Sequence, residues 1–118
     1  MESKMTITEN GTKQWRNENG ELHRTDGSAV IWEDGEKWWC QNGKIHREDG
    51  PAIILPSGSE MWYQNGQLHR EDGPAVIWSD GEKEWWIEGK RYSFQKWANE
   101  LNLDQKTRLE MVLKWNPQ

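Results

Sequence analysis

The chain has 118 residues, with 15 Lys and Arg against 20 Asp and Glu, so its formal net charge is −5. This acidity argues against direct nucleic-acid binding, which needs a basic surface, and favours a basic protein partner. Only 33% of the residues are apolar, but ten Trp supply large buried areas for a small folded domain. A single Cys argues against disulfides and multi-Cys metal sites and predicts a reducing, cytoplasmic location. Neither a membrane span nor a secretory signal is expected, because the apolar runs are short.

A 23-residue period organises most of the chain and predicts a repeat array. Its clearest marks are four glycines spaced by 23 residues, Gly20, Gly43, Gly66 and Gly89. The units span about 19–41, 42–64 and 65–88, and a partial unit precedes them. We therefore expect a repeat sheet over residues 1–92 and a different structure over 93–116.

Each unit carries two turn signals, which predict consecutive β-hairpins. The Asn-Gly pairs that begin at Asn19, Asn42 and Asn65 favour type I′ turns. A second set of turns is predicted at Asp34-Gly35, Ser57-Gly58 and Asp80-Gly81. Runs rich in Trp and Ile predict strands near 5–8, 12–18, 29–33, 36–41, 52–55, 59–64, 75–78 and 82–87. The expected fold is mainly β, an antiparallel meander that forms a single extended or curled sheet.

After Arg91 the pattern changes to a helical one. Phe94, Trp97, Ala98 and Leu101 lie at i, i+3, i+4 and i+7, and Ser93 precedes them as an expected N-cap. Asp104 is the expected cap of a second helix, whose inward residues are predicted to be Leu109, Val112, Leu113 and Trp115. The two helices are expected to cap the repeat array, with a partner-docking helix as the alternative.

Positions that are identical in every repeat are assigned to packing. These are Trp39, Trp62 and Trp85, with Ile31, Ile54 and Ile77, and Ala29, Ala52 and Ala75. Side chains alternate across a strand, so the residues beside each repeat Trp face the other way. They form a candidate partner-binding face made of Trp32, Trp38, Cys40, Met61, Tyr63, Trp78, Glu84 and Trp86. Its cover could be the C-terminal helices, a second copy of the chain or a foreign partner.

Three polar ladders follow the same period. His23, His46 and His69, with Asp26, Asp49 and Asp72, are expected to bond the loop backbone before each Gly-Pro-Ala or Gly-Ser-Ala. We predict no metal site, because equivalent His residues about 10–14 Å apart cannot share one ion. Arg24, Arg47 and Arg70 are expected to form surface ion pairs, with an anion-binding ladder as the sharper alternative.

No catalytic constellation is recognisable. Cys40 has no evident base, and its equivalents in the next repeats are Tyr63 and Trp86, so it is interpreted as a strand residue. Phosphate loops, dinucleotide-binding glycines and zinc-protease motifs are missing from the sequence. We therefore predict neither an enzyme nor a cofactor.

The stretches Trp39–His46 and Trp62–His69, in which a strand ends at Asn-Gly and is followed by His, resemble the MORN repeat. They are also similar to its bacterial and phage relatives, including YwqK-like antitoxins, over roughly residues 10–92. The chain departs from the usual MORN pattern at 47–52 and 70–75, where Arg-Glu-Asp-Gly-Pro-Ala replaces Gly-x-Gly. The resemblance implies a β-hairpin repeat fold and a role in conflict between phage and bacteria.

The leading functional interpretation is a non-catalytic protein-binding module. It would act as an inhibitor of the anti-defence or antitoxin type and block a host or cognate protein in the cytoplasm (the host cytoplasm, if phage-encoded). One alternative is a small-molecule binder that sequesters a cyclic nucleotide signal, stacking the base on exposed Trp and Tyr. Another is a structural module that closes a homodimer. Membrane binding is not expected of this acidic chain.

Overall fold

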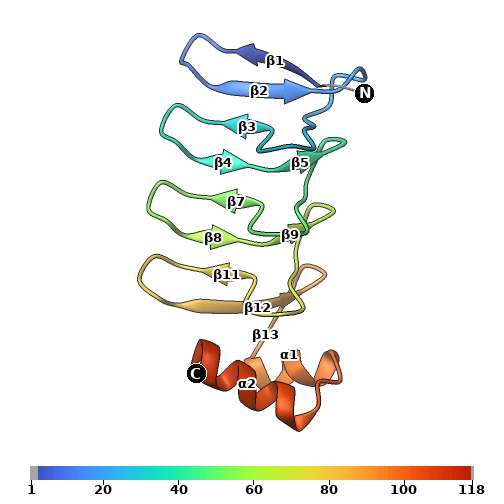
Figure 1. The fold of residues 1–118 in the computed structure, drawn as a ribbon, viewed down its shortest axis with the longest axis vertical. Coiled ribbons are helices and arrows are strands. Elements are labelled where there is room, and N and C mark those ends of the chain that lie inside the picture. The colour runs from blue at the N-terminus through green and yellow to red at the C-terminus, as the bar shows by residue number, and fades with distance from the viewer. Residues whose placement is uncertain (1–2, 118) are drawn as a thin grey trace.

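The computed structural model describes residues 3–117 and shows one open antiparallel sheet of hairpins followed by two helices (Figure 1). The molecule is elongated, with extents of 49 × 29 × 20 Å, and its hairpins follow one another along the long axis. The predicted mainly-β meander is confirmed, and the sheet is extended rather than closed. Within residues 3–117, neither helix is long and apolar enough to cross a membrane.

The main sheet contains nine strands in almost sequential order. In space they run β1 (Lys4–Ile7), β2 (Lys13–Arg16), β3 (Val30–Ile31), β4 (Lys37–Trp38), β7 (Ile53–Ile54), β8 (Glu60–Met61), β11 (Val76–Ile77), β12 (Lys83–Ile87) and β13 (Lys90–Tyr92). Two short hairpins stand beside it, β5 (Cys40–Gln41) with β6 (Lys44–Ile45) and β9 (Tyr63–Gln64) with β10 (Gln67–Leu68). Each of the three full repeats therefore adds two strands to the main sheet.

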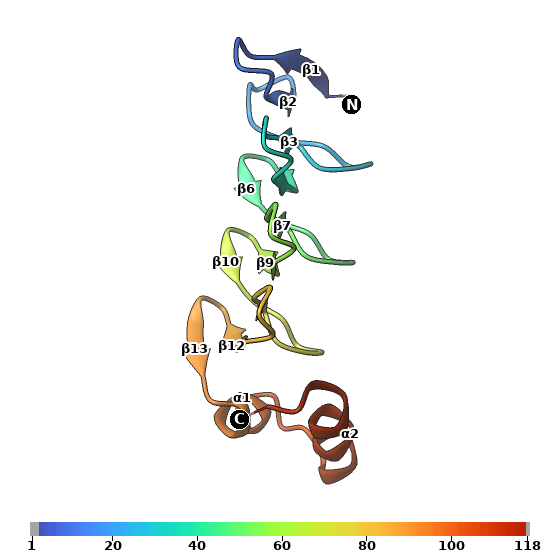
Figure 2. The same cartoon turned by 90° about the vertical axis from the view of Figure 1, so that its left-hand side faces the viewer.

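The predicted strands at 36–41 and 59–64 are each divided, at Trp39 and Trp62. Before Trp39, the chain pairs with β3 and β7 of the main sheet, and after it the chain pairs with β6. The change of partner breaks the strand and directs a second hairpin out of the sheet. Figure 2 shows β6, β10 and β13 on one side and the loops that lead into β3, β7 and β11 on the opposite side.

The second hairpins close through left-handed residues, as the Asn-Gly pairs predict. Asn42 and Asn65 have φ of 49° and 52°, and Glu88 occupies the same turn position with φ of 48°. The prediction of a type I′ turn at Asn19-Gly20 is wrong, because only Gly20 of that pair has a positive φ. The turn at Asn19-Gly20 is longer, and the hydrogen bond that closes it runs from the backbone N–H of Asn17 to the carbonyl of Glu21 at 2.9 Å.

Both helix starts agree with the sequence prediction. In α1 (Phe94–Glu100) Ser93 Oγ accepts from Lys96 N–H at 3.2 Å, and in α2 (Gln105–Trp115) Asp104 Oδ1 accepts from Thr107 N–H at 2.8 Å. Trp97 and Ala98 of α1 are fully buried against Trp85 of the last repeat. The helices therefore cover the end of the array and not its face (Figure 1).

The predicted inward stripe of α2 is wrong at three of its four positions. Leu109, Val112 and Leu113 are exposed by 59%, 40% and 77%. Trp115 packs against the core as predicted, and Met111 joins it, because α2 contacts the last repeat through this i, i+4 pair.

The sheet core lies along its middle. Ala29, Ala52 and Ala75 are completely buried, in agreement with their predicted packing role, and the equivalent Ile residues are half-buried. The face expected to need an external cover is already partly closed, because Val30, Ile53 and Val76 on it are buried. Part of the reason is register, since Trp38 lies opposite both Val30 and Ile53 and can lay its ring across them.

Candidate functional site

The candidate partner face is made of equivalent side chains from the three full repeats. The first repeat contributes Trp32 and Trp38, and the second contributes Leu55, Met61 and Tyr63. The third contributes Trp78, Glu84 and Trp86. We call these eight side chains the Trp–Glu face. They are half-buried except Trp78, which is 37% exposed, so their apolar surface is only partly covered by the chain itself.

At the C-terminal end of this face, one carboxylate holds two indoles. Glu84 Oε2 accepts from Trp78 Nε1 at 2.8 Å, and its Oε1 accepts from Trp86 Nε1 at 2.9 Å. Arg91 Nη1 lies 4.0 Å from the same carboxylate, whose side chain is mostly buried. Both oxygens are therefore used to fix the two rings in place.

The N-terminal end of the face has the same chemistry with different residues. Glu36 Oε2 accepts from Trp38 Nε1 at 2.6 Å, and Trp32 meets Trp38 edge-to-face with ring centroids 5.3 Å apart. Sequence reasoning missed Glu36, although the signal was present. Residues i and i+2 share one face of a strand, and a Glu lies two residues before Trp38 just as Glu84 lies two before Trp86.

Cys40 does not belong to the accessible face. Its side chain is buried, and burial raises the pKa of its thiol to about 11. A thiol in this state is a poor nucleophile at neutral pH. Burial likewise raises the pKa of Tyr63, whose ring is half-buried.

Each arginine of the ladder makes three contacts within its own repeat and stacks on the Trp of the repeat before it. In the second repeat Arg47 stacks on Trp39 with Cζ 4.0 Å from the ring centroid, and its Nε donates to Asp49 Oδ1 at 2.9 Å. Nη1 donates to the Pro51 carbonyl at 3.0 Å, and a Cβ built on Gly50 would lie only 2.8 Å from Cζ. Arg24 and Arg70 repeat this arrangement on Trp15 and Trp62.

This geometry explains three residues that recur in the repeat motif. The Trp provides the stacking surface, the Asp neutralises the guanidinium, and the Gly leaves room for it. The hydrogen bond and charge of Arg47 lower the pKa of the Asp49 carboxyl. A free anion at this ladder would have to compete with a carboxylate that is already in place.

The histidines connect consecutive repeats, which differs from the expected bond to their own loop. Nδ1 of His23, His46 and His69 accepts the backbone N–H of Asn42, Asn65 and Glu88 respectively, each at 3.0 Å. An imidazole that accepts at Nδ1 is neutral and carries its proton on Nε2. The three Asp residues also differ from expectation. Instead of bonding the loop backbone, Oδ1 of Asp26, Asp49 and Asp72 accepts a hydrogen bond from Nε of the Arg two positions earlier.

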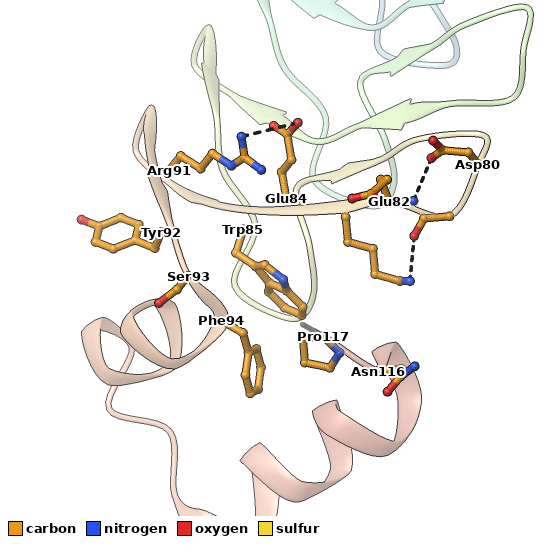
Figure 3. Close-up of a pocket in the computed structure, with 12 residues that line it drawn as sticks. Asp80, Glu82, Glu84, Trp85, Arg91, Tyr92, Ser93, Phe94, Asn116 and Pro117 are labelled. Atoms are coloured by element: carbon orange, nitrogen blue, oxygen red, sulfur yellow. Dashed lines mark hydrogen bonds and ion pairs between the residues drawn. The ribbon is translucent and has the colours of Figure 1, made fainter.

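A cleft of about 720 Å³ lies where the last hairpin meets the helices (Figure 3). Its rim carries three carboxylates, those of Asp80, Glu82 and Glu84, and two cations, Lys83 and Arg91. Lys83 Nζ donates to the Gly81 carbonyl at 3.0 Å, and Arg91 faces Glu84, so both cations already have partners. The cleft is thus more acidic than basic, and it was not predicted from the sequence.

Across residues 3–117, no three His, Cys, Asp or Glu side chains are grouped so that they could hold a metal ion. Comparisons with protein-family models, curated proteins and solved structures find no match to this chain. The resemblance to MORN-like repeats therefore rests on the repeat motif alone and stays a prediction.

Proposed function

We propose that this chain is a non-catalytic protein-binding module that engages a basic protein through the Trp–Glu face. The observation that carries the proposal is the pair of carboxylate-held indole groups at the two ends of a face that the helices leave open. Large aromatic side chains dominate the energetics of protein interfaces. Rings that are already fixed lose little conformational entropy on binding, which favours affinity.

The charge of the chain supports a basic partner. The net charge is −5, and Glu36 and Glu84 place carboxylates among the indoles. Complementary charge increases the rate of encounter and selects against acidic proteins. We propose, on the motif resemblance, that the module is an inhibitor of the phage anti-defence or antitoxin type and that its target is a host or cognate protein.

Two variants of the full chain test this proposal. Trp32→Ala combined with Trp78→Ala removes one indole from each end of the face, and Leu113→Ala removes a more exposed apolar side chain elsewhere. The tagged wild type and both tagged variants would be used to capture partners from cell lysate, and each complex would be measured by native mass spectrometry. We expect a stoichiometric protein complex for the wild type and for Leu113→Ala, and its loss for the double variant. Equal capture by all three proteins would contradict the role of this face.

The same spectra address the two other hypotheses. A bound mass of a few hundred daltons would support the nucleotide-sequestering alternative, and a doubled mass without other protein would support the homodimer. The nucleotide alternative has less physical support here. The guanidiniums of the ladder are paired with Asp carboxylates, and the cleft at the helices carries more acidic than basic groups.

A further inference from the structure

The C-terminal helix shows which side chain fits against the arginine ladder. Trp115 of α2 lies over the last loop, with its ring centroid 5.2 Å from Cζ of Arg70. A Cβ built on Gly73 would come within 3.0 Å of Cζ2 of Trp115, so the ring edge rests directly on the glycine. Arg70 is therefore close to two rings, that of Trp62 at 3.8 Å and that of Trp115 at 5.2 Å.

The second repeat has the same groups around Arg47 without a second ring, and its Gly50 is only partly buried whereas Gly73 is buried. We define the Arg47 cradle as Arg47, Gly50 and Trp39, in which stacking and hydrogen-bond distances agree with those around Arg70 within 0.2 Å. The Arg47 side chain is 22% exposed, against 11% for Arg70. Within residues 3–117, a second ring close to a ladder guanidinium is found only at Arg70.

We propose that the Arg47 cradle docks an aromatic side chain from a basic helix of a protein partner, in the way that Trp115 docks at Arg70. The equivalent cradle formed by Arg24, Gly27 and Trp15 would take a second aromatic side chain. This inference rests on the proposed protein-binding role, but it uses a surface that needs neither Trp32 nor Trp78.

The charge around the cradle supports the choice of a basic helix. Glu48 and Asp49 lie next to Arg47 in the chain, and the Asp49 side chain is 88% exposed. In α2, the helix that supplies Trp115, three basic residues outnumber the single Glu110, and Lys114 Nζ lies 5.0 Å from the Trp115 ring. A partner helix of this composition would bring an indole to Arg47 and positive charge to the carboxylates beside it.

The test uses the full chain, labelled with ¹⁵N, and a synthetic peptide of residues 104–117 as the probe. Arg Nε–H, Gly amide and Trp indole signals would be followed by NMR as the peptide is added. We expect saturable shifts at Arg47, Gly50 and Trp39, with those at Arg24 and Gly27 alongside. A control peptide with Trp115→Ala should bind on the order of tenfold or more weakly, because it lacks the anchoring ring.

Three results would overturn the proposal. One is the absence of shifts at Arg47 and Arg24 at millimolar peptide. Another is a response confined to Arg70 and Gly73, which would mean that the peptide only displaces the chain's own helix. The third is the same shifts on concentrating the protein without peptide, which would identify a second copy as the occupant.

Two variants of the chain separate the cradle from the Trp–Glu face. Gly50→Ala places a methyl group against Arg47 and should weaken binding at this repeat while the Arg24 cradle still responds. If this variant does not fold, Glu48→Gln combined with Asp49→Asn keeps the three cradle residues and removes the two negative charges beside them. That variant should weaken binding of the basic peptide, and equal binding would contradict the proposal. Trp32→Ala with Trp78→Ala should leave the peptide shifts unchanged, whatever happens to capture of the natural partner.

Discussion

The repeat Trp of the first two full repeats and the repeat Trp of the last one are covered in two different ways. Trp39 and Trp62 are covered by the guanidiniums of Arg47 and Arg70, which remain in contact with water. The residue 23 positions after Arg70 is Ser93, which caps α1 instead of stacking on Trp85. Phe94 and Trp97 then take the place of the guanidinium, with ring centroids 4.9 Å and 4.6 Å from Trp85.

The difference separates a cover that allows another repeat from one that ends the array. An arginine of the ladder, stacked on its Trp, is polar on its outer side and leaves the next hairpin free to form beside it. The helical cover is apolar and buries Trp85 to 4% exposure, whereas Trp39 and Trp62 stay half-buried. Repeat arrays need such a terminal cap because their last unit has no following neighbour.

Removing the ring at the centre of the cap should have the largest effect. Trp97 is fully buried, packs on Trp85 and donates from Nε1 to the Arg70 carbonyl at 3.0 Å. We expect Trp97→Ala to lower the free energy of unfolding by about 3–5 kcal/mol, measured by urea denaturation. The exposed Leu113→Ala is the matched control, with a change within about 0.5 kcal/mol. Equal effects of the two variants would mean that the helices do not stabilise the array.

Removing one arginine of the ladder should lower the free energy of unfolding by less than Trp97→Ala does. Arg47→Ala removes the stack on Trp39 and the bonds to Asp49 and Pro51, and we expect a loss of about 1–3 kcal/mol in urea denaturation. Arg47→Lys should recover less than half of this, because an ammonium lacks the planar fork that bonds and stacks together. Full recovery by Lys would show that only the charge matters.

A stabilising change is expected at the turn of the last repeat. Glu88 has φ of 48°, while the equivalent residues in the other repeats are Asn42 and Asn65. Asn tolerates the left-handed conformation better than Glu does, so Glu88→Asn should raise the free energy of unfolding by about 0.5–1 kcal/mol. The reverse change, Asn65→Glu, should lower it. A fall in the thermal midpoint of Glu88→Asn would contradict this explanation.

The smallest expected effect is on the response to acid. The Asp49 carboxyl has a pKa lowered chiefly by its hydrogen bond from Arg47, and the Asp104 carboxyl has a pKa lowered by bonds from Thr107. A folded-state pKa below the unfolded value contributes stability that is present above the unfolded pKa and is lost as pH falls through the folded one. Stability below about pH 4 should therefore fall less steeply in Asp49→Asn and in Asp104→Asn.

Thermal midpoints measured from pH 2 to pH 6 would check this expectation in the arginine ladder and in the helical cap separately. Asp80→Asn, at an exposed turn, is the control and should follow the wild-type profile. A profile unchanged by Asp49→Asn would mean that its pairing with Arg47 does not stabilise the fold.

Local chemistry in the sequence determined much of this structure. The 23-residue period, the Asn-Gly turns at Asn42 and Asn65, the caps at Ser93 and Asp104 and the buried Ala positions are all encoded by residues close to each other in the chain. Turn conformation, capping and strand alternation depend on a few neighbouring residues, so a single sequence is enough to predict them.

Tertiary structure decided how the repeats hold each other and what the helices cover. His46 bonds the turn at Asn65, 19 residues further on, and Arg47 meets Trp39 where the chain folds back through the hairpin of β5 and β6. The outward stripe of Leu109, Val112 and Leu113 on α2 likewise depends on how the helix is docked. Periodicity shows that a helix has an apolar side, but the direction of that side is set by the surface it meets, and that surface exists only after the hairpins have stacked.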